Sequence, residues 1–294
     1  MFIGNQSIQK YFGKLIESDG LSHAYLFYGP EGIGKKLFAK EILEKLTGSL
    51  NSPDLRIIDK ESDEIPIADI RELKNFIHLT PFGEYKVVII NNAHNLGRDA
   101  SNALLKILEE PPGKSVLFLV SHLPKLLLPT IISRCQKIRF QPLRKKEITD
   151  YLITKNKLEP ETAASIAKFA NSSLGQALEL AQNFDNFQKN INLLNKLAKA
   201  DFLGRFEAAK KILAEEDLKK IINDWFVYSA SLLPIFFVQS TTRKSRILDF
   251  SAPTEVGGEI GTAKLSRELL YLNNLLSKPQ FNQKLALENF LIRL

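Results

Sequence analysis

Cysteine is almost absent from this sequence, with Cys135 the only one among 294 residues. A disulfide or a cysteine-ligated zinc ion needs more than one, so the sequence excludes a disulfide-stabilised secreted protein and a zinc-ribbon protein. Long apolar runs are also missing. The longest charge-free stretch, residues 225–238, is too short to cross a bilayer and contains Pro234, and no signal-peptide order follows Met1. We therefore expect a cytoplasmic protein that contacts no membrane.

Neither sign of charge dominates the composition. Lys and Arg total 40 and Asp and Glu total 33, which gives a formal charge of +7 and a pI near 9.2. A basic excess of this size suits an anionic partner such as a DNA backbone, but solvated helix faces explain it equally well. With 44% apolar and 25% charged residues, the chain has the composition of a folded globular protein.

The first half of the chain alternates short apolar segments with helical patterns. The stretch 86–90 is apolar after its first residue, with no polar alternation, as expected for a strand that is buried on both faces of a parallel sheet. Strand–helix alternation predicts an α/β fold with a central, mostly parallel sheet. The five predicted strands are residues 24–28, 55–58, 86–90, 116–120 and 137–140.

After residue 142 the pattern becomes helical throughout. Short helices are predicted first, and longer amphipathic helices follow from about residue 187. The segment 240–261, with several basic residues and two adjacent glycines, is the best candidate for a mobile connection. Aromatic residues crowd the stretch 225–237, where a helical core and an interface between subunits remain equally good interpretations.

A glycine-rich loop lies between the first predicted strand and the following helix. Gly29, Gly32 and Gly34 precede Lys35, which matches the phosphate-loop pattern. Glycines let the backbone turn its N–H groups toward a phosphate, and the helix that follows presents the positive end of its dipole at the same place. The loop is therefore a candidate site for a phosphate group.

Two segments depart from the pattern of a working site. Lys36 stands where Ser or Thr would place a hydroxyl on Mg²⁺, and an ammonium repels a cation instead of ligating it. Asn91 and Asn92 stand at the end of a buried strand where an acidic residue would hold the metal. The sequence predicts a site that does not hydrolyse nucleotide but retains weak binding of ATP, ADP or phosphate, with Lys36 as a substitute for the missing cation.

Four segments together resemble one family. They are residues 21–27 with the loop that follows, 85–94, the run SNALLKILEEPP at 101–112, and LPTIISRC at 128–135. Through about residue 180 the chain is similar to the AAA+ clamp-loader subunits of bacterial DNA polymerase III. The resemblance implies an AAA+ nucleotide-binding domain over residues 1–142, a helical lid over 143–186 and a helical collar domain over 187–294.

Within that family the chain resembles the delta-prime type more than the ATP-hydrolysing gamma/tau type. The resemblance implies an arginine in the lid of an active subunit where this chain has Gln176, in addition to the departures at Lys36, Asn91 and Asn92. It also implies a four-cysteine zinc module after the phosphate-loop helix, which this sequence lacks. No zinc is therefore expected.

The Ser-Arg-Cys motif of the family is Ser133-Arg134-Cys135 in this chain. The resemblance implies that Arg134 projects into the ATP site of a neighbouring subunit, where a guanidinium stabilises charge on the γ-phosphate. A local ion pair with a carboxylate is the alternative for Arg134. Cys135, without a paired base, is expected to be a small buried side chain.

The resemblance implies a subunit that helps to load a sliding clamp on primed DNA without hydrolysing ATP itself. The implied partners are gamma/tau-type and delta-type subunits, the clamp and primed DNA. Two alternatives stay open: an active clamp-loader ATPase, and a stand-alone DNA-binding AAA+ protein that would bind duplex DNA in a salt-sensitive way.

Overall fold

The computed structural model describes residues 2–60, 64–213, 218–232, 262–276 and 283–293. The chain divides into two compact units. The first comprises Met1–Tyr151 together with Ser172–Gly175, and the second comprises Leu152–Asn171 and Gln176–Leu294. The three-part division at residues 142 and 186 stays a prediction.

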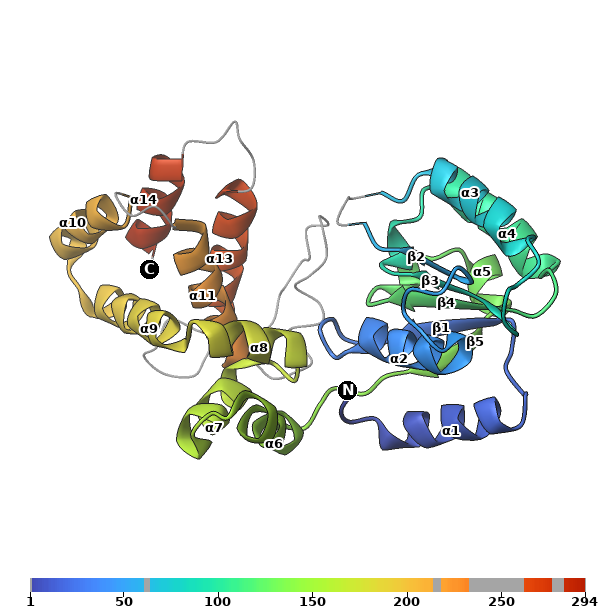
Figure 1. The fold of residues 1–294 in the computed structure, drawn as a ribbon. Coiled ribbons are helices and arrows are strands. Elements are labelled where there is room, and N and C mark those ends of the chain that lie inside the picture. Colours follow the sequence, from blue (N-terminus) through green and yellow to red (C-terminus); the bar gives the residue numbers. More distant parts are fainter. Residues whose placement is uncertain (1, 61–63, 214–217, 233–261, 277–282, 294) are drawn as a thin grey trace. The chain divides into compact units, whose positions relative to one another are not determined.

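A five-stranded parallel sheet forms the centre of the first unit (Figure 1). The strand order is β2-β3-β4-β1-β5, so strands that are neighbours in space are not always consecutive in sequence. Because all strands run in one direction, their carboxyl ends share one edge: Tyr28 of β1 pairs with Ser121 of β4. The strands are β1 (Ala24–Tyr28), β2 (Leu55–Ile58), β3 (Lys86–Ile90), β4 (Ser115–Ser121) and β5 (Gln136–Arg139).

Helices cover both faces of this sheet. Figure 1 shows α3, α4 and α5 over one face and α1 and α2 over the other. Two short 3-10 helices follow the carboxyl ends of strands, η1 after β3 and η2 after β4. The bounds are α1 (Gln6–Glu17), α2 (Lys35–Thr47), α3 (Ile67–Ile77), η1 (Ala93–Asn95), α4 (Arg98–Glu109), η2 (Pro124–Leu126) and α5 (Pro129–Ser133).

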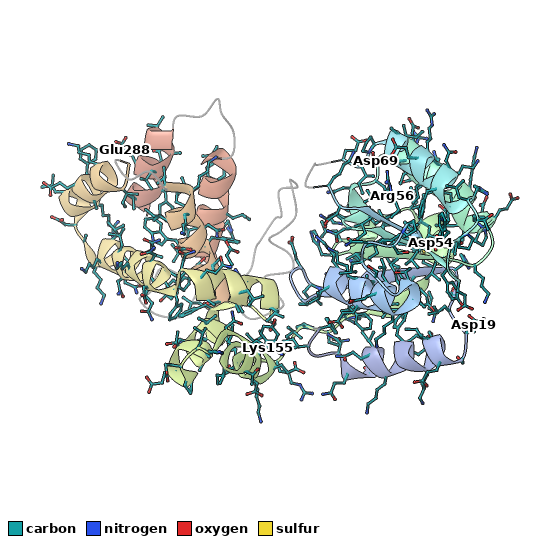
Figure 2. All side chains as sticks on the ribbon, viewed as in Figure 1. Asp19, Asp54, Arg56, Asp69, Lys155 and Glu288 are labelled. Carbon is teal, nitrogen blue, oxygen red and sulfur yellow. The ribbon has the colours of Figure 1, made fainter. Side chains whose placement is uncertain are left out.

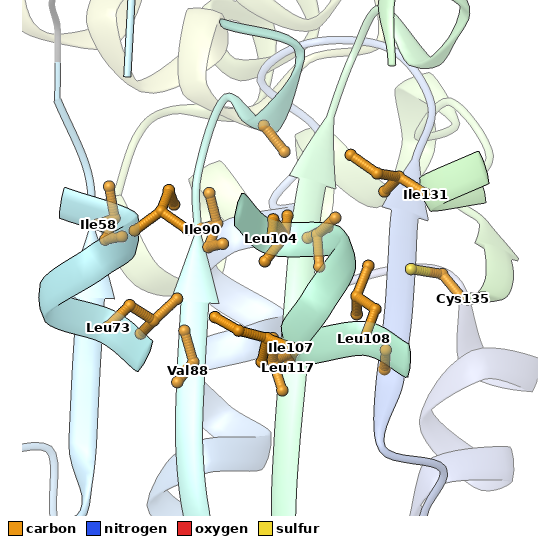
Figure 3. Close-up of a cluster of buried hydrophobic side chains, with 14 of the residues drawn as sticks. Ile58, Leu73, Val88, Ile90, Leu104, Ile107, Leu108, Leu117, Ile131 and Cys135 are labelled. Atoms are coloured by element: carbon orange, nitrogen blue, oxygen red, sulfur yellow. The ribbon is translucent and has the colours of Figure 1, made fainter. Parts of the chain in front are cut away.

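Alternate residues of the central strands supply two separate hydrophobic layers. Val88 belongs to the cluster under α3, α4 and α5, drawn in Figure 3, and packs there with Leu104 and Ile131. Val87 faces the opposite way and joins Phe12 of α1 in the second cluster. Strand side chains alternate between faces, so an unbroken apolar strand such as β3 is explained by burial on both sides.

The described residues of the second unit form helices joined by loops and include no strand. Its core gathers around the fully buried Trp225, whose indole Nε1 donates a hydrogen bond to the backbone oxygen of Asn190 at 2.7 Å. Two of the remaining helices, α6 and α8, begin in residues of the first unit. The remaining helices are α6 (Lys145–Asn156), α7 (Pro160–Phe169), α8 (Leu174–Gln182), α9 (Phe184–Lys199), α10 (Phe202–Leu213), α11 (Leu218–Ser231), α13 (Thr262–Leu276) and α14 (Gln283–Arg293). None of the described helices combines the length and apolarity needed to cross a bilayer.

The predicted α/β fold with a parallel sheet and a helical second part is confirmed. Three strands have the predicted bounds, β4 extends by one residue at each end, and β5 begins at Gln136 instead of residue 137 and ends at Arg139 instead of 140. Helix α1 is an element that the sequence analysis did not predict. The segment 240–261 and the aromatic residues 236–237 lie outside the described residues.

Candidate functional site

The glycine-rich loop adopts a backbone that only glycine enters readily. Gly29, Gly32 and Gly34 have φ angles of 144°, 72° and 90° between the end of β1 and the start of α2. A Cβ on Gly29 would stand 2.4 Å from the backbone oxygen of Phe140, and one on Gly32 would stand 2.0 Å from the hydroxyl of Ser173. Positive φ and close packing therefore both require glycine in this loop.

The Lys35 ammonium lies inside the loop. Its Nζ donates a hydrogen bond to the backbone oxygen of Gly29 at 2.9 Å and another to that of Pro30. The side chain is buried, and burial lowers the pKa of the ammonium to about 8 although the carboxylate of Glu31 offsets part of that effect. The loop thus holds a positive charge at the start of α2, where a phosphate would be attracted.

Lys36, Asp59 and Asn91 meet where the phosphate-loop pattern would have a metal ion. Lys36 in the first turn of α2 forms an ion pair with Asp59, which directly follows β2. Asn91, which directly follows β3, donates its amide to the other Asp59 oxygen at 2.8 Å. Partial burial alone would raise the pKa of Asp59, but hydrogen bonds from Lys36 and Asn91 outweigh it and hold the pKa below its ordinary value.

These contacts do not fit a Mg²⁺ ion held by a hydroxyl and a carboxylate. Lys36 supplies an ammonium instead of an oxygen ligand, and the charge of Asp59 is already matched by that ammonium. Asn92 has a positive φ of 50° and is the N-cap of η1. Asp59, which the sequence analysis missed, links Lys36 to Asn91, whereas Lys35 contacts the carbonyls of its own loop.

A pair of histidines at the same edge of the sheet was also missed. His94 lies in η1 after β3 and His122 follows β4, and their ring centroids are 4.3 Å apart. The His94 Nδ1 is 3.3 Å from the Ser121 hydroxyl. Burial lowers the pKa of His94 to about 4, and His122 and Lys35 act in the same direction. Both histidines follow predicted strands, but only the strand order of the structure shows that β3 and β4 are neighbours and that the two rings meet.

Arg134 lies at the opposite edge of the sheet from the phosphate loop. It precedes β5, whose first residue, Gln136, pairs with Tyr25 in the first half of β1, whereas the loop begins after Tyr28. From Tyr25 to Tyr28 the strand advances by three residues, which is about 10 Å along its direction. The register therefore places Arg134 where it does not face its own loop.

The Arg134 side chain is partly exposed and held by two contacts. Its Nη2 is 2.8 Å from the Glu109 carboxylate, and its Nη1 donates a hydrogen bond to the backbone oxygen of Thr130 at 3.0 Å. The Ser133 hydroxyl donates to that same oxygen at 3.0 Å. Cys135 is buried, which raises the pKa of its thiol to about 12, so no thiolate nucleophile is available there.

Gln176 belongs to the second unit, at the start of α8. The Asn171 amide donates to its Oε1 at 3.5 Å. Its role as a lid position stays a prediction. Within the described residues, no cluster of three or more His, Cys, Asp or Glu side chains could hold a metal ion.

Two solved structures with low sequence identity share the fold. A gamma subunit-related protein of DNA polymerase III from Thermotoga maritima is 21% identical, with 96% of this chain and 97% of that chain covered and a TM-score of 0.54. A RuvB variant from the same organism is 18% identical, with coverage of 65% and 64% and a TM-score of 0.51. These likenesses show the α/β AAA+ fold.

Sequence comparisons identify the family more narrowly than the structural likenesses do. The family model described as DNA polymerase III, delta subunit, matches residues 45–144. The DNA polymerase III subunit delta' of Bacillus subtilis is 37% identical over 209 residues, 65% of this chain. The subunit gamma of Buchnera aphidicola is 31% identical over 246 residues, which are 73% of this chain and 68% of that relative. The chain belongs to the family of DNA polymerase III delta' and gamma/tau subunits.

The match to the delta' relatives is partial in length. The chain spans 63% of the Bacillus subtilis delta' subunit and 42% of the Pseudomonas aeruginosa delta' subunit, with which it is 40% identical over 136 residues. These two relatives therefore match over less than two thirds of their length. The family model covers the region that contains Asn91, Asn92 and the Ser133-Arg134-Cys135 motif.

Proposed function

We propose that this chain is a delta'-type subunit of a cytoplasmic clamp loader and helps to place a sliding clamp on primed DNA. It works in a complex with gamma/tau-type and delta-type subunits of the DNA polymerase III holoenzyme. It does not hydrolyse ATP, and Arg134 acts in the ATP site of a neighbouring subunit. It requires no cofactor, and its own loop binds phosphate or nucleotide weakly at most.

The position of Arg134 in the sheet carries this proposal. An arginine that served its own phosphate loop would stand at the carboxyl edge of the strands, whereas Arg134 stands at the amino edge, before β5. Its side chain is about one-third exposed. A planar guanidinium offers two parallel donors to phosphate oxygens, so an exposed one at this edge suits a phosphate on another subunit.

Rigid surroundings support the same role. Arg134 is the C-cap of α5, and both Ile131 and Cys135 near it are buried in the cluster that Figure 3 draws. An arginine that reaches into the active site of a neighbouring subunit is called an arginine finger. It contributes more to the rate when the protein already holds it near its working position, because less entropy is then lost during the reaction. Fingers of this type contribute roughly 10³ to 10⁵ in rate.

The contacts around Lys36 support the absence of hydrolysis. The ammonium and the Asp59 carboxylate satisfy each other, and the Asn91 amide completes the group. Neither an amide nor an ammonium activates water as a general base. We therefore assign to this loop a structural role, in which Lys35 supplies a positive charge for a weakly bound phosphate.

The proposal is tested in a reconstituted complex in which Arg134 is the only arginine finger. Gamma/tau-type subunits whose own Ser-Arg-Cys arginine is replaced by Ala are assembled with delta and with this chain, and ATP turnover is measured with primed DNA and clamp. R134A should lower the remaining turnover on the order of 10³-fold. R139A, at an exposed arginine of β5, is the matched control and should leave turnover unchanged.

Other outcomes would favour the alternatives. Unchanged turnover with R134A, in a complex of normal size by gel filtration, would reject the finger. Steady phosphate release by the purified chain alone would make it an active ATPase. Tight, salt-sensitive binding of duplex DNA by the chain alone would support a stand-alone DNA-binding protein.

A further inference from the structure

Helix α4 ends with acidic residues where the helix dipole disfavours them. Glu109 is its last residue and Glu110 follows, while Lys106 is the basic residue of the last turn. A carboxylate at the negative end of a helix destabilises that end, so local helix stability does not explain Glu109. Its contact with Arg134 from another helix does supply a compensating charge.

Both ends of this contact are anchored on rigid backbone. Leu108, just before Glu109, is buried in the same cluster as Ile131 and Cys135, which flank Arg134 (Figure 3). The Arg134 N–H donates to the backbone oxygen of Ile131 at 3.1 Å. Only the two side chains therefore move when the ion pair opens, and the backbone keeps the guanidinium near one position.

The side chains themselves stay accessible. Glu109 is 49% exposed and Arg134 is 35% exposed, and their closest atoms are 2.8 Å apart. An exposed ion pair of this kind biases a side chain only weakly, because water and salt screen it. Bidentate contact with a phosphate is stronger than a single contact with a carboxylate, so the guanidinium leaves Glu109 readily when such a phosphate is presented.

We propose that Glu109 is a positioning residue that holds Arg134 in a resting orientation until a neighbouring triphosphate displaces it. This inference rests on the proposed function, because it requires Arg134 to act on another subunit. Glu109 never touches the nucleotide; it competes with the nucleotide for the guanidinium. Removing its charge raises the fraction of time that the finger is free by about two- to fivefold.

The first experiment tests the resting contact in the full-length chain alone. Phenylglyoxal reacts with accessible guanidinium groups, and peptide mass spectrometry reports how fast Arg134 is modified. E109Q keeps the size of the side chain and should raise that rate about two- to fivefold. E110Q is the control, since no ion pair involving Glu110 occurs among the residues that the structure describes. Equal rates in E109Q and wild type would overturn the proposal.

The second experiment uses the complex in which Arg134 is the sole finger. E109Q should raise ATP turnover without DNA about two- to fivefold, and E110Q should leave it at the wild-type value. Faster modification of Arg134 without any rise in turnover would also overturn the proposal. Loss of the finger itself is judged separately, from R134A: if that variant turns over ATP normally, the proposed function fails and not only the role of Glu109.

Discussion

Two adjacent lysines have entirely different environments. Lys35 is buried and donates to the carbonyls of its own loop, while Lys36 is partly exposed and pairs with Asp59 of another segment. The sequence analysis predicted that both would act on a bound phosphate, and that stays a prediction. It did not predict Asp59, because the partner of Lys36 lies 23 positions away and no spacing rule joins them.

The histidine pair makes stability depend on pH. His94 has a pKa lowered to about 4 in the fold and an ordinary value of 6.5 when unfolded. A lowered pKa means that the unfolded chain binds the proton more tightly, so the stabilisation is complete above pH 6.5 and is lost as the pH falls toward 4. Solvent reaches part of the ring, and the expected loss is therefore about 1–2 kcal/mol.

H94N isolates this contribution. Urea unfolding followed by circular dichroism, from pH 8 to pH 4, gives the difference in unfolding free energy between wild type and variant. That difference should be constant above pH 7 and should shrink by about 1–2 kcal/mol between pH 6.5 and pH 4. A difference that stays the same over the whole range would show that His94 is not held neutral by its surroundings.

At the scale of elements, α1 shows why a helix can escape prediction. Its N-cap, Asn5, has a positive φ of 46° and makes no side-chain capping bond, and no acidic residue stands in its first turn. Gly13 lies inside the helix, where glycine lowers the helix propensity of the segment. Apart from asparagine at the N-cap, the usual start signals are absent, and the helix is explained by its packing, since Phe12 is buried against Tyr25 and Phe27 of the sheet.

Two glycines in different elements should respond oppositely to Ala. A Cβ on Gly13 meets nothing within 4 Å, so G13A should stabilise the first unit by about 0.5–1 kcal/mol through helix propensity. Gly29 has a φ of 144°, and its Cβ would stand 2.4 Å from the backbone oxygen of Phe140. G29A should therefore destabilise by about 1–3 kcal/mol.

Urea unfolding by circular dichroism measures both variants against wild type. If G29A matched wild type, the loop would be free to adopt a different backbone, and the argument that glycine is required there would be wrong. A destabilising G13A would mean that the α1 surface at this position packs more closely than the structure shows.

The strands were predicted better than the site. An apolar strand that is buried on both faces is visible in the sequence because all its residues obey one local rule, as β3 does. The ends of β4 and β5 differ from prediction by a residue, since pairing with neighbouring strands decides where a strand begins and ends. The position of Arg134 along the strand direction, relative to the glycine-rich loop, depends on that same pairing. Only the register of β1 and β5 could therefore show that the two lie at opposite edges of the sheet.

At the scale of the whole molecule, each compact unit has its own core. The first unit contains the two layers on the sheet, and the second contains the cluster around Trp225. Trp225 is the only tryptophan in the chain. Its fluorescence therefore reports on the second unit, whereas circular dichroism reports on both.

A buried ion pair offers a way to perturb the first unit alone. Lys86 and Asp54, which is labelled in Figure 2, are each 3% exposed and 2.8 Å apart. Asp54 also accepts the N–H groups of Phe82 and Gly83 at 3.0 and 2.6 Å. K86M leaves this carboxylate buried without its partner, and it should destabilise the first unit by about 3–5 kcal/mol.

The unfolding midpoints reported by circular dichroism and by Trp225 fluorescence should then differ. In K86M the circular dichroism transition of the first unit moves to lower urea, while the midpoint of Trp225 fluorescence stays in place. K114M is the control, because the ion pairs of Lys114 with Asp19 and Glu84 are exposed, and it should move neither midpoint appreciably. A shift of the fluorescence midpoint in K86M would mean that the two units unfold as one.

The sequence by itself determined the α/β fold, the glycine loop and the family, because these depend on local periodicity, on residues of special conformation and on contiguous motifs. Tertiary structure decided which charges meet. The pairs Lys36–Asp59 and Arg134–Glu109, and the histidines at 94 and 122, are each separated by more than 20 positions. Such contacts follow from strand order and register, which bring the ends of different strands and helices together and leave no pattern in the chain itself.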